Sequence, residues 1–346
     1  MRLRAALHPY ALPLKRPWAA ASAVLHERRG TLLSLTSDDG MIGWGDCAPL
    51  PSSDPAHHAR MAGALTDVLT WSGDSDAWQL RCTAIPVPEV RWALETALFD
   101  LAARRNQLPL MVQLGAPTFI PAVGVNAALG ALDEHTGKRA AAAFAQGYRI
   151  AKIKVGVAAA ARELELLQDV NAATAGRLRL RLDANRAWRE DTAREFLERI
   201  AVLPIDAVEE PLARPTLQQL HALQRELPYA IAVDESLPQF GADALLTAGA
   251  VRRLVVKPAR LGGVVATRAL VNRAHSTGVE VVLTSVVDSA VGVTAAAHLA
   301  AALAPDVSHG LATLDWLADD VADAPVVRQG QLLLHAAPGL GLTPEF

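Results

Sequence analysis

Cysteine is scarce in this sequence of 346 residues, which holds only Cys47 and Cys82. Two cysteines are too few for a disulfide framework and are typical of a reducing, cytoplasmic environment. Long apolar runs are missing too: the Ala-rich run at 290–304 is too short to cross a membrane and contains His298. The first residues carry scattered charges and several prolines instead of the apolar core of a signal peptide. We therefore expect a cytoplasmic protein without a membrane span.

Basic runs are absent as well. The formal net charge is −3, and no stripe of lysine and arginine stands out, which argues against binding to nucleic acid. What the sequence does have is 51% hydrophobic and 20% charged residues, a composition that can bury a large core. A chain of this length is expected to form one large α/β domain and a smaller one. No feature of the sequence indicates an oligomeric state.

The first part of the chain has the pattern of an α+β module. Two apolar segments, 31–35 and 42–45, flank a Ser-Asp-Asp-Gly turn, which is a strong hairpin signal. Helical spacing of apolar residues follows at 57–70 and 88–106. We expect this module to occupy residues 1–110.

Beyond residue 115 the pattern alternates between strand and helix, which indicates an α/β fold. Strands are predicted at 121–126, 149–155, 178–183, 205–209, 229–234, 253–257, 279–284 and, less regularly, 309–313. Helices are predicted between them at 133–146, 158–172, 190–201, 216–226, 263–276 and 289–303. This repeat predicts a TIM-like (β/α)₈-type barrel with an irregular last unit. A doubly wound sheet is the alternative, but no Gly-rich phosphate loop follows the first strand.

The domain division follows from these patterns. We expect the barrel at 115–324 and a C-terminal tail at 325–346 that completes the N-terminal module. A strand predicted at 331–335 in this tail is expected to return to that module.

Charged side chains stand at or near the ends of successive predicted strands. In chain order they are Lys152 with Lys154, then Asp183, Glu209, Asp234 and Lys257. From Asp183 onward, neighbours are about 25 residues apart, which is one strand–helix repeat, and the carboxyl ends of barrel strands meet at one rim. The spacing therefore predicts that these side chains converge.

The lysine pair has a defined orientation in a strand. Lys152 and Lys154 are two residues apart and point to the same side, while Ile153 and Val155 point to the other. If Ile153 and Val155 pack under the helices, both ammonium groups face the barrel interior. A shift of one residue in this strand would reverse that orientation.

Three carboxylates in one cleft repel one another, and a divalent cation relieves the repulsion. Oxygen ligands favour Mg²⁺, with Mn²⁺ as a substitute, so we expect Asp183, Glu209 and Asp234 to bind the ion. Such an ion can bind a substrate carboxylate and stabilise the enediolate that forms when a proton leaves the α-carbon. A lysine base must be partly neutral, and a second ammonium group and the ion would lower its pKa.

Each of these residues alone has an ordinary explanation. A charged residue at a strand end is usually solvated or paired at the surface. The ordered combination at repeat spacing is much harder to obtain from surface charge.

The pattern of KxK, Asp, Glu, Asp and Lys resembles the enolase superfamily, in its muconate-lactonizing-enzyme-like subgroup, over nearly the whole chain. The resemblance implies a (β/α)₇β barrel under an α+β capping domain built from the N-terminal part and the C-terminal tail. Within the barrel, LRLDANRAW, EEP, DES, VKPARLGG, TSVVDSAVG and GLATLDW are similar to the o-succinylbenzoate synthase family of menaquinone biosynthesis.

This resemblance implies a Mg²⁺-dependent hydro-lyase that acts on a small carboxylate and removes water from 2-succinyl-6-hydroxy-2,4-cyclohexadiene-1-carboxylate. Lys154 would be the base, Lys152 its electrostatic partner, and Lys257 would face the substrate from the opposite side. Asp183, Glu209 and Asp234 would hold the ion.

Substrate contacts are expected from Asn185, Ser285 and Asp288. The last two follow the seventh predicted strand, where a role as helix-start caps explains them equally well. The loops at 17–28 and 48–55 of the capping domain are expected to close over the substrate and exclude water.

Other activities remain open. An N-acylamino-acid racemase, or another racemase or epimerase of this superfamily, could use Lys154 and Lys257 as two bases. Dipeptide epimerases often have a DxD motif where this sequence has TSVVDS, which counts against that activity, and muconate cycloisomerase is a weaker alternative. A non-catalytic barrel that only binds a ligand is disfavoured because all the candidate bases and metal ligands are present.

Overall fold

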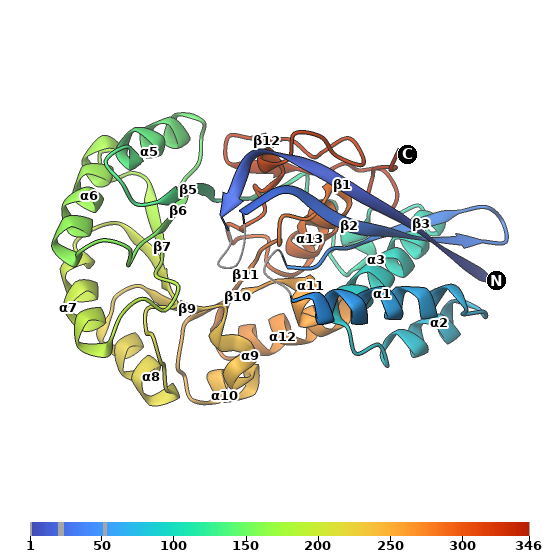
Figure 1. The fold of residues 1–346 in the computed structure, drawn as a ribbon, viewed down its shortest axis with the longest axis horizontal. Coiled ribbons are helices and arrows are strands. Elements are labelled where there is room, and N and C mark those ends of the chain that lie inside the picture. The colour runs from blue at the N-terminus through green and yellow to red at the C-terminus, as the bar shows by residue number, and fades with distance from the viewer. Residues whose placement is uncertain (1, 20–23, 51–53, 346) are drawn as a thin grey trace.

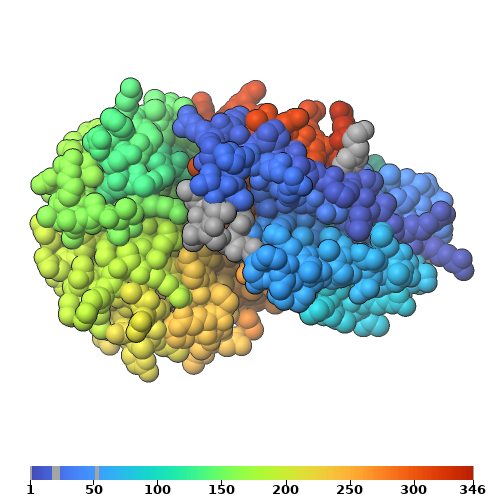
Figure 2. Space-filling view, in the orientation of Figure 1, coloured from blue at the N-terminus to red at the C-terminus, as the bar shows by residue number. Residues whose placement is uncertain are grey.

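The computed structural model describes residues 2–19, 24–50 and 54–345. A curled parallel sheet with helices on its outer side lies beside an antiparallel sheet with its own helices (Figure 1). In the space-filling view the N-terminal elements, in blue, lie directly against the barrel elements (Figure 2). This is the predicted α/β architecture, a TIM-like barrel with an α+β capping domain. None of the described helices is long and apolar enough to span a membrane.

The capping elements come from the N-terminal part of the chain. The antiparallel sheet has the order β1 (Leu3–Ala19), β2 (Val24–Ser37), β3 (Ile42–Cys47), and it is followed by α1 (Pro55–Leu69), α2 (Ser75–Cys82) and α3 (Pro88–Arg105). Helix α3 packs so closely on β3 that a Cβ atom at Gly45 would lie 1.8 Å from the carbonyl oxygen of Ala93. Glycine at this position therefore allows the helix to sit on the sheet.

The two predicted capping loops are only partly described. Both flanks of the 17–28 segment are strand, because β1 and β2 form an antiparallel hairpin whose pairing extends to Ala19 and Val24. The expected closing segments fall on residues 20–23 and 51–53, which lie outside the described residues.

The barrel sheet has seven parallel strands in chain order. They are β5 (Ala127–Ala131), β6 (Ile150–Lys154), β7 (Arg179–Asp183), β8 (Ile205–Glu209), β9 (Ala230–Val233), β10 (Arg253–Val256) and β11 (Glu280–Leu283). Its main helices are α5 (Thr136–Ala145), α6 (Ala160–Ala173), α7 (Glu190–Ile200), α8 (Leu217–Glu226), α12 (Val264–Ser276) and α13 (Ala290–Leu303). Shorter helices that the periodicity did not reveal are α4 (Leu110–Gln113), α9 (Ser236–Phe240), α10 (Ala242–Thr247), α11 (Pro258–Leu261) and the 3₁₀ turn at Leu314–Trp316.

Alternation along the strands separates the outer core from the barrel interior. Ile153 and Val155, which alternate with the lysines, are buried in the main hydrophobic core. On the inner side Ala207, Ala232 and Val255 form a small cluster of their own. Small side chains here leave room above them for longer polar side chains at the rim.

A β-bulge places a carboxylate inside the lower barrel. The register between β7 and β8 shifts after Leu180, so Asp206 has no partner residue on β7. Asp206 is buried and accepts hydrogen bonds from Arg181 at 3.0 Å and from Arg253. Burial disfavours the charge of Asp206, but the two guanidinium groups outweigh burial and lower its pKa. These charges are therefore a paired structural layer below the rim.

The barrel closes through two residues instead of a full eighth strand. The strand expected at 309–313 is wrong: His309 forms a bridge to Val125, and Gly310 forms one to Thr284. His309 Nδ1 accepts the Leu283 N–H at 3.0 Å, so its Nε2 donates to the Ala304 carbonyl at 3.0 Å. Burial lowers the pKa of His309 to about 4, which keeps it neutral in this role.

The C-terminal tail differs from the expectation. The first predicted barrel strand, 121–126, falls on β4 (Ala122–Gly124), and the barrel strand β5 that follows it was not predicted. Strand β4 lies outside the barrel sheet and pairs with β13 (Gln331–Leu333), which also pairs with β12 (Val327–Arg328). The tail strand therefore returns to the start of the barrel and not to the N-terminal sheet. The residues that come after β13 in the chain are the ones that reach α3. Leu340 N–H donates to Asp100 at 2.7 Å, and Arg104 donates to the Leu342 carbonyl at 2.7 Å.

Candidate active site

The strand register brings the predicted residues to one rim. Lys154 pairs with Asp183 between β6 and β7, and Asp183 pairs with Glu209 between β7 and β8. Asp234 and Lys257 each follow the last residue of their strands, β9 and β10. The carboxyl ends of adjacent parallel strands thus deliver all these groups to the same edge.

Lys152 lies between two carboxylates. Its Nζ is 2.7 Å from Glu209 Oε2 and 2.9 Å from Asp183 Oδ2. Burial lowers the pKa of Lys152, but the charges of Glu209 and Asp183 outweigh burial and raise the pKa well above its usual value. Lys152 is therefore a fixed cation, unsuited to act as a base near neutral pH.

Glu209 is the most deeply buried of the three acids, at 1% exposure. Burial raises its pKa to about 7; Lys152 opposes this shift, and the negative charges of Asp183 and Asp234 add to it. Burial is therefore the main reason why the charged form of Glu209 is disfavoured, and Lys152 offsets only part of this effect.

The other two lysines are in different situations. Lys257 forms an ion pair with Asp234 Oδ2. Lys154 is exposed, and its ammonium group has no hydrogen bond or ion pair with any residue that the structure describes. Among the three rim lysines, Lys154 is thus the one whose amino group contacts no described carboxylate.

The donor set suits a hard divalent cation, because three carboxylates from adjacent strands supply only oxygen. Within the described residues, however, no three acidic, histidine or cysteine side chains surround a common metal position. The ammonium groups of Lys152 and Lys257 are the groups that contact the carboxylates. Two ammonium groups thus face three carboxylates, and this excess of negative charge is the feature that a divalent ion would relieve.

The predicted substrate contacts are spread around this rim. Asn185 is exposed and has a positive φ of 42°; its N–H donates to Asp183 Oδ1 at 3.1 Å, and its side chain donates to Glu235 at 3.3 Å. Asn185 thus shares the β7 turn with Asp183.

Ser285 and Asp288 lie in the buried loop between β11 and α13. The Ser285 hydroxyl accepts the Val287 N–H at 3.1 Å and lies 2.7 Å from the Thr313 hydroxyl. Asp288 is 5% exposed, and its carboxylate accepts the Val286 N–H at 3.3 Å. Burial raises the pKa of Asp288 to about 7, and the charge of Asp46 in the capping sheet raises it further.

Several polar residues that hold this loop were not found from the sequence. Asp46 in β3 accepts hydrogen bonds from the Ser289 N–H at 3.0 Å, the Ser289 hydroxyl at 2.8 Å and the Tyr10 hydroxyl at 2.8 Å. Arg28 in β2 donates to the Val287 carbonyl at 2.9 Å. The capping sheet therefore reaches the barrel loop directly, through contacts between residues too distant in sequence for any local pattern to reveal.

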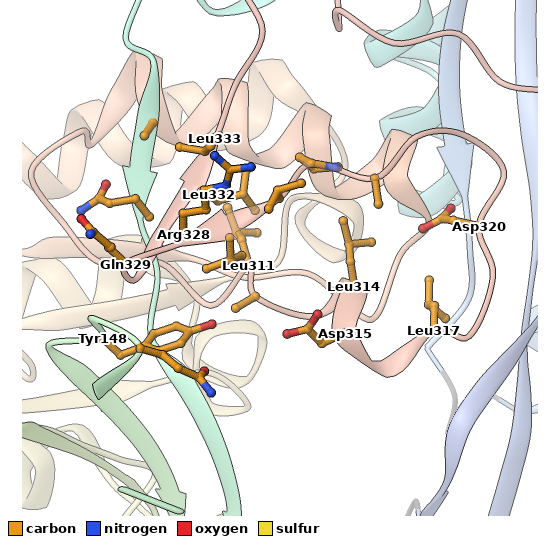
Figure 3. A pocket seen from close by; sticks show the side chains of 18 of the residues that line it. Tyr148, Leu311, Leu314, Asp315, Leu317, Asp320, Arg328, Gln329, Leu332 and Leu333 are labelled. Atoms are coloured by element: carbon orange, nitrogen blue, oxygen red, sulfur yellow. The ribbon is translucent and has the colours of Figure 1, made fainter. Parts of the chain in front are cut away.

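A cavity lies away from the rim. It has a volume of about 1000 Å³ and is lined by residues such as Tyr148, Leu314, Asp315, Arg328 and Leu332 (Figure 3). None of the rim lysines or carboxylates lines it. The chemistry therefore belongs to the rim, where the charged groups converge, and not to this cavity.

Comparisons with known proteins agree with this geometry. The family model of the enolase C-terminal domain-like group matches residues 135–345, and the mandelate racemase/muconate lactonizing enzyme N-terminal domain matches residues 4–115. The chain belongs to the enolase superfamily.

Relatives within the enolase superfamily have more than one activity. The chain is 33% identical to o-succinylbenzoate synthase of Enterobacter sp. (strain 638), over 86% of this chain and 88% of that protein. It is 26% identical to L-Ala-D/L-Glu epimerase of Bacillus subtilis, over 96% of this chain and 94% of that protein. Among solved structures, the dipeptide epimerase of Methylococcus capsulatus complexed with Mg and the dipeptide L-Arg-D-Lys is 26% identical, with a TM-score of 0.86 and 99% of each chain covered.

Proposed function

We propose that this chain is an o-succinylbenzoate synthase, which removes water from 2-succinyl-6-hydroxy-2,4-cyclohexadiene-1-carboxylate. The observation that carries the proposal is the rim itself, where Lys154, with which no described residue pairs, stands beside three carboxylates on adjacent strands. The choice of this reaction is supported by relatives of that name at 33% and 28% identity and high coverage.

Lys154 is the base in this proposal. Its amino group takes the proton from the carbon next to the substrate carboxylate. The same group, now protonated, delivers that proton to the departing hydroxide, so that water leaves and the ring becomes aromatic. General acid–base catalysis of this kind contributes about 10²–10⁴-fold to the rate.

Asp183, Glu209 and Asp234 would hold the divalent ion. When bound, the ion supplies positive charge that stabilises the negative charge developing on the substrate carboxylate. Lys152 keeps Asp183 and Glu209 oriented through its two ion pairs. The ammonium group of Lys257, held on the rim by Asp234, adds a second cation on the side opposite to Lys154.

Epimerisation is the second candidate, and two observations favour it. The relative from Bacillus subtilis and the structure from Methylococcus capsulatus are both epimerases that match nearly the full chain. Lys154 on β6 and Lys257 after β10 are also separated by three intervening strands, as two bases on opposite faces of a substrate require. The missing DxD motif and the lower identity place this function second.

One experiment separates the two functions. The purified protein is mixed with the cyclohexadiene substrate, and o-succinylbenzoate formation is followed with Mg²⁺ and then with EDTA. Rapid turnover that EDTA stops is the expected result. If no product forms with Mg²⁺, the synthase proposal fails, and deuterium exchange at the α-carbon of dipeptides and N-acylamino acids in D₂O then tests the racemase and epimerase alternative.

A further inference from the structure

Glu210, the second acid of the Glu-Glu-Pro motif, is fully buried beside the rim, at 1% exposure. It follows Glu209 directly, but its carboxylate faces the backbone of the next strand. Its Oε1 accepts the N–H groups of Asp234 at 2.9 Å and Ser236 at 2.6 Å. A single oxygen thus holds the turn that carries Asp234.

The second oxygen of Glu210 connects this turn to the preceding strand. Oε2 accepts the Ser236 hydroxyl at 2.7 Å and Arg186 Nε at 3.1 Å. Arg186 lies in the turn after β7, and its Nη2 also donates to Ser236 at 2.9 Å and to Gln239 at 2.8 Å. The backbone N–H of Arg186 donates to the Glu210 carbonyl at 2.7 Å.

The backbone at these positions is strained. Asn185, Arg186 and Glu210 have positive φ angles of 42°, 63° and 46°, in the left-handed region that side chains other than glycine rarely adopt. Such conformations persist only where the surrounding contacts hold them. The four hydrogen bonds to the Glu210 carboxylate are contacts of this kind, and they join the ends of β7, β8 and β9.

We propose that Glu210 and Arg186 are a pair of positioning residues that fix the Asp234 carboxylate relative to Asp183 and Glu209. The pair does not touch the substrate; it acts through the turns that carry the three acids. This role rests on the proposed function in one respect, because it assumes that these acids bind a divalent ion. Replacing a residue that orients a metal ligand typically lowers metal affinity or activity by about 10–100-fold.

The Glu210→Gln variant tests the pair at constant size. A glutamine oxygen can still accept one set of N–H groups, but its NH₂ group would then face the Arg186 guanidinium, donor against donor. Glu190→Gln is the matched control, because Glu190 is a partly exposed glutamate at the start of α7 that also pairs with an arginine, Arg194.

Mg²⁺ affinity is measured by titration calorimetry on the full-length protein at pH 7.5. We expect Glu210→Gln to bind Mg²⁺ about 10–100-fold more weakly, and Glu190→Gln to bind it as the wild type does. Hydrogen exchange in EDTA supplies the second measurement: the segment at 230–240 should exchange faster in Glu210→Gln and not in the control. Arg186→Lys keeps the positive charge but loses the geometry of the guanidinium contacts. This variant should show the same two effects to a smaller extent, and it replaces Glu210→Gln in the test if Glu210→Gln does not fold.

The outcomes are distinct. Wild-type Mg²⁺ affinity in Glu210→Gln, or in Arg186→Lys where only that variant folds, overturns the proposal. Faster exchange without a change in affinity also overturns it, because the pair would then have only a structural role. Wild-type protein that binds Mg²⁺ but does not form o-succinylbenzoate defeats the proposed function and leaves the positioning test intact. Wild-type protein that binds no Mg²⁺ overturns the positioning role.

Discussion

At the scale of single residues, the three rim lysines have different environments despite their identical chemistry. Lys154 is exposed and has no ion-pair partner in the part of the chain that the structure describes, whereas Lys152 is held by two carboxylates. We expect Lys154→Ala to lower o-succinylbenzoate formation by at least about 100-fold, because the base is lost. The free energy of unfolding should change by no more than about 0.5 kcal/mol, which is usual for substitutions at exposed positions. Initial rates and urea unfolding check both, and substantial remaining turnover would exclude Lys154 as the base.

Asp288 supports a prediction about pH. Its pKa is raised from an ordinary value of about 3.9 to about 7, chiefly by burial and then by Asp46. The folded protein therefore binds this proton more tightly than the unfolded chain. The resulting stability is fully present below about pH 4 and is lost as the pH rises through about 7.

The Asp288→Asn variant removes this contribution together with its coupling to Asp46, whereas Glu209 and Asp320, whose pKa values are also raised, are unchanged in it. At pH 8 the variant should unfold at a higher urea concentration than the wild type, and this difference between the two midpoints should be clearly smaller at pH 5. Urea titrations at both pH values measure the difference. A loss of stability that is equal at both pH values would mean that Asp288 acts as a permanently charged partner of Arg28.

At the scale of elements, helix α13 obtains its N-terminal hydrogen-bond acceptors from outside itself. Ser289 caps no N–H of the helix; the carboxylates of Asp46 and Asp320 accept the Ser289 and Ala290 N–H groups instead. Carboxylates at a helix N-terminus are favoured both by hydrogen bonding and by the helix dipole. The capping sheet therefore supports a barrel helix and the loop before it.

Asp46→Ala removes this support and leaves Ser289 and Tyr10 without their acceptor. Loss of a cap costs about 1 kcal/mol, and stranded buried donors cost about 1–3 kcal/mol, so we expect at least about 2 kcal/mol of destabilisation. Tyr10→Phe removes one hydrogen bond and should cost about 1 kcal/mol. Urea unfolding of both variants and of Asp46→Ala/Tyr10→Phe measures their coupling. Additive losses would show that the two side chains do not interact.

The elements that the sequence predicted well are those with a local pattern. Strands β6 to β11 and the longer helices α6, α7, α8, α12 and α13 were predicted to within one or two residues, because alternation and helical spacing are properties of neighbouring residues. Asp206 shows where such patterns fail: a β-bulge, which depends on the neighbouring strand, turns it toward Arg181. The same reason explains the unpredicted partner of β13 and the two-residue closure at His309 and Gly310.

The rim shows the same division. The positions of Lys152, Lys154, Asp183, Glu209, Asp234 and Lys257 followed from strand ends and repeat spacing. The contact between Asp46 and Ser289 joins residues 243 positions apart, and no local signal records it. Glu210 did have a signal, since it adjoins Glu209 in the motif, but its φ of 46° and its partners in the turn after β9 needed the fold.

At the scale of the whole molecule, the proposed ion links the rim to global stability. Three acids on adjacent strands approach one another only in the folded barrel, so an ion held by them binds the folded state and not the unfolded chain. At a Mg²⁺ concentration 100 times the dissociation constant, this preference adds about 2.7 kcal/mol to the free energy of unfolding.

We expect the thermal midpoint of the wild type to rise with Mg²⁺ and to return to its original value when EDTA is added. In Asp234→Asn most of the rise should disappear, whereas Lys154→Ala should keep it, because Lys154 contacts none of the three acids. Calorimetric scans across a Mg²⁺ series measure these midpoints, and a wild-type midpoint that is independent of Mg²⁺ would remove the ion from this rim.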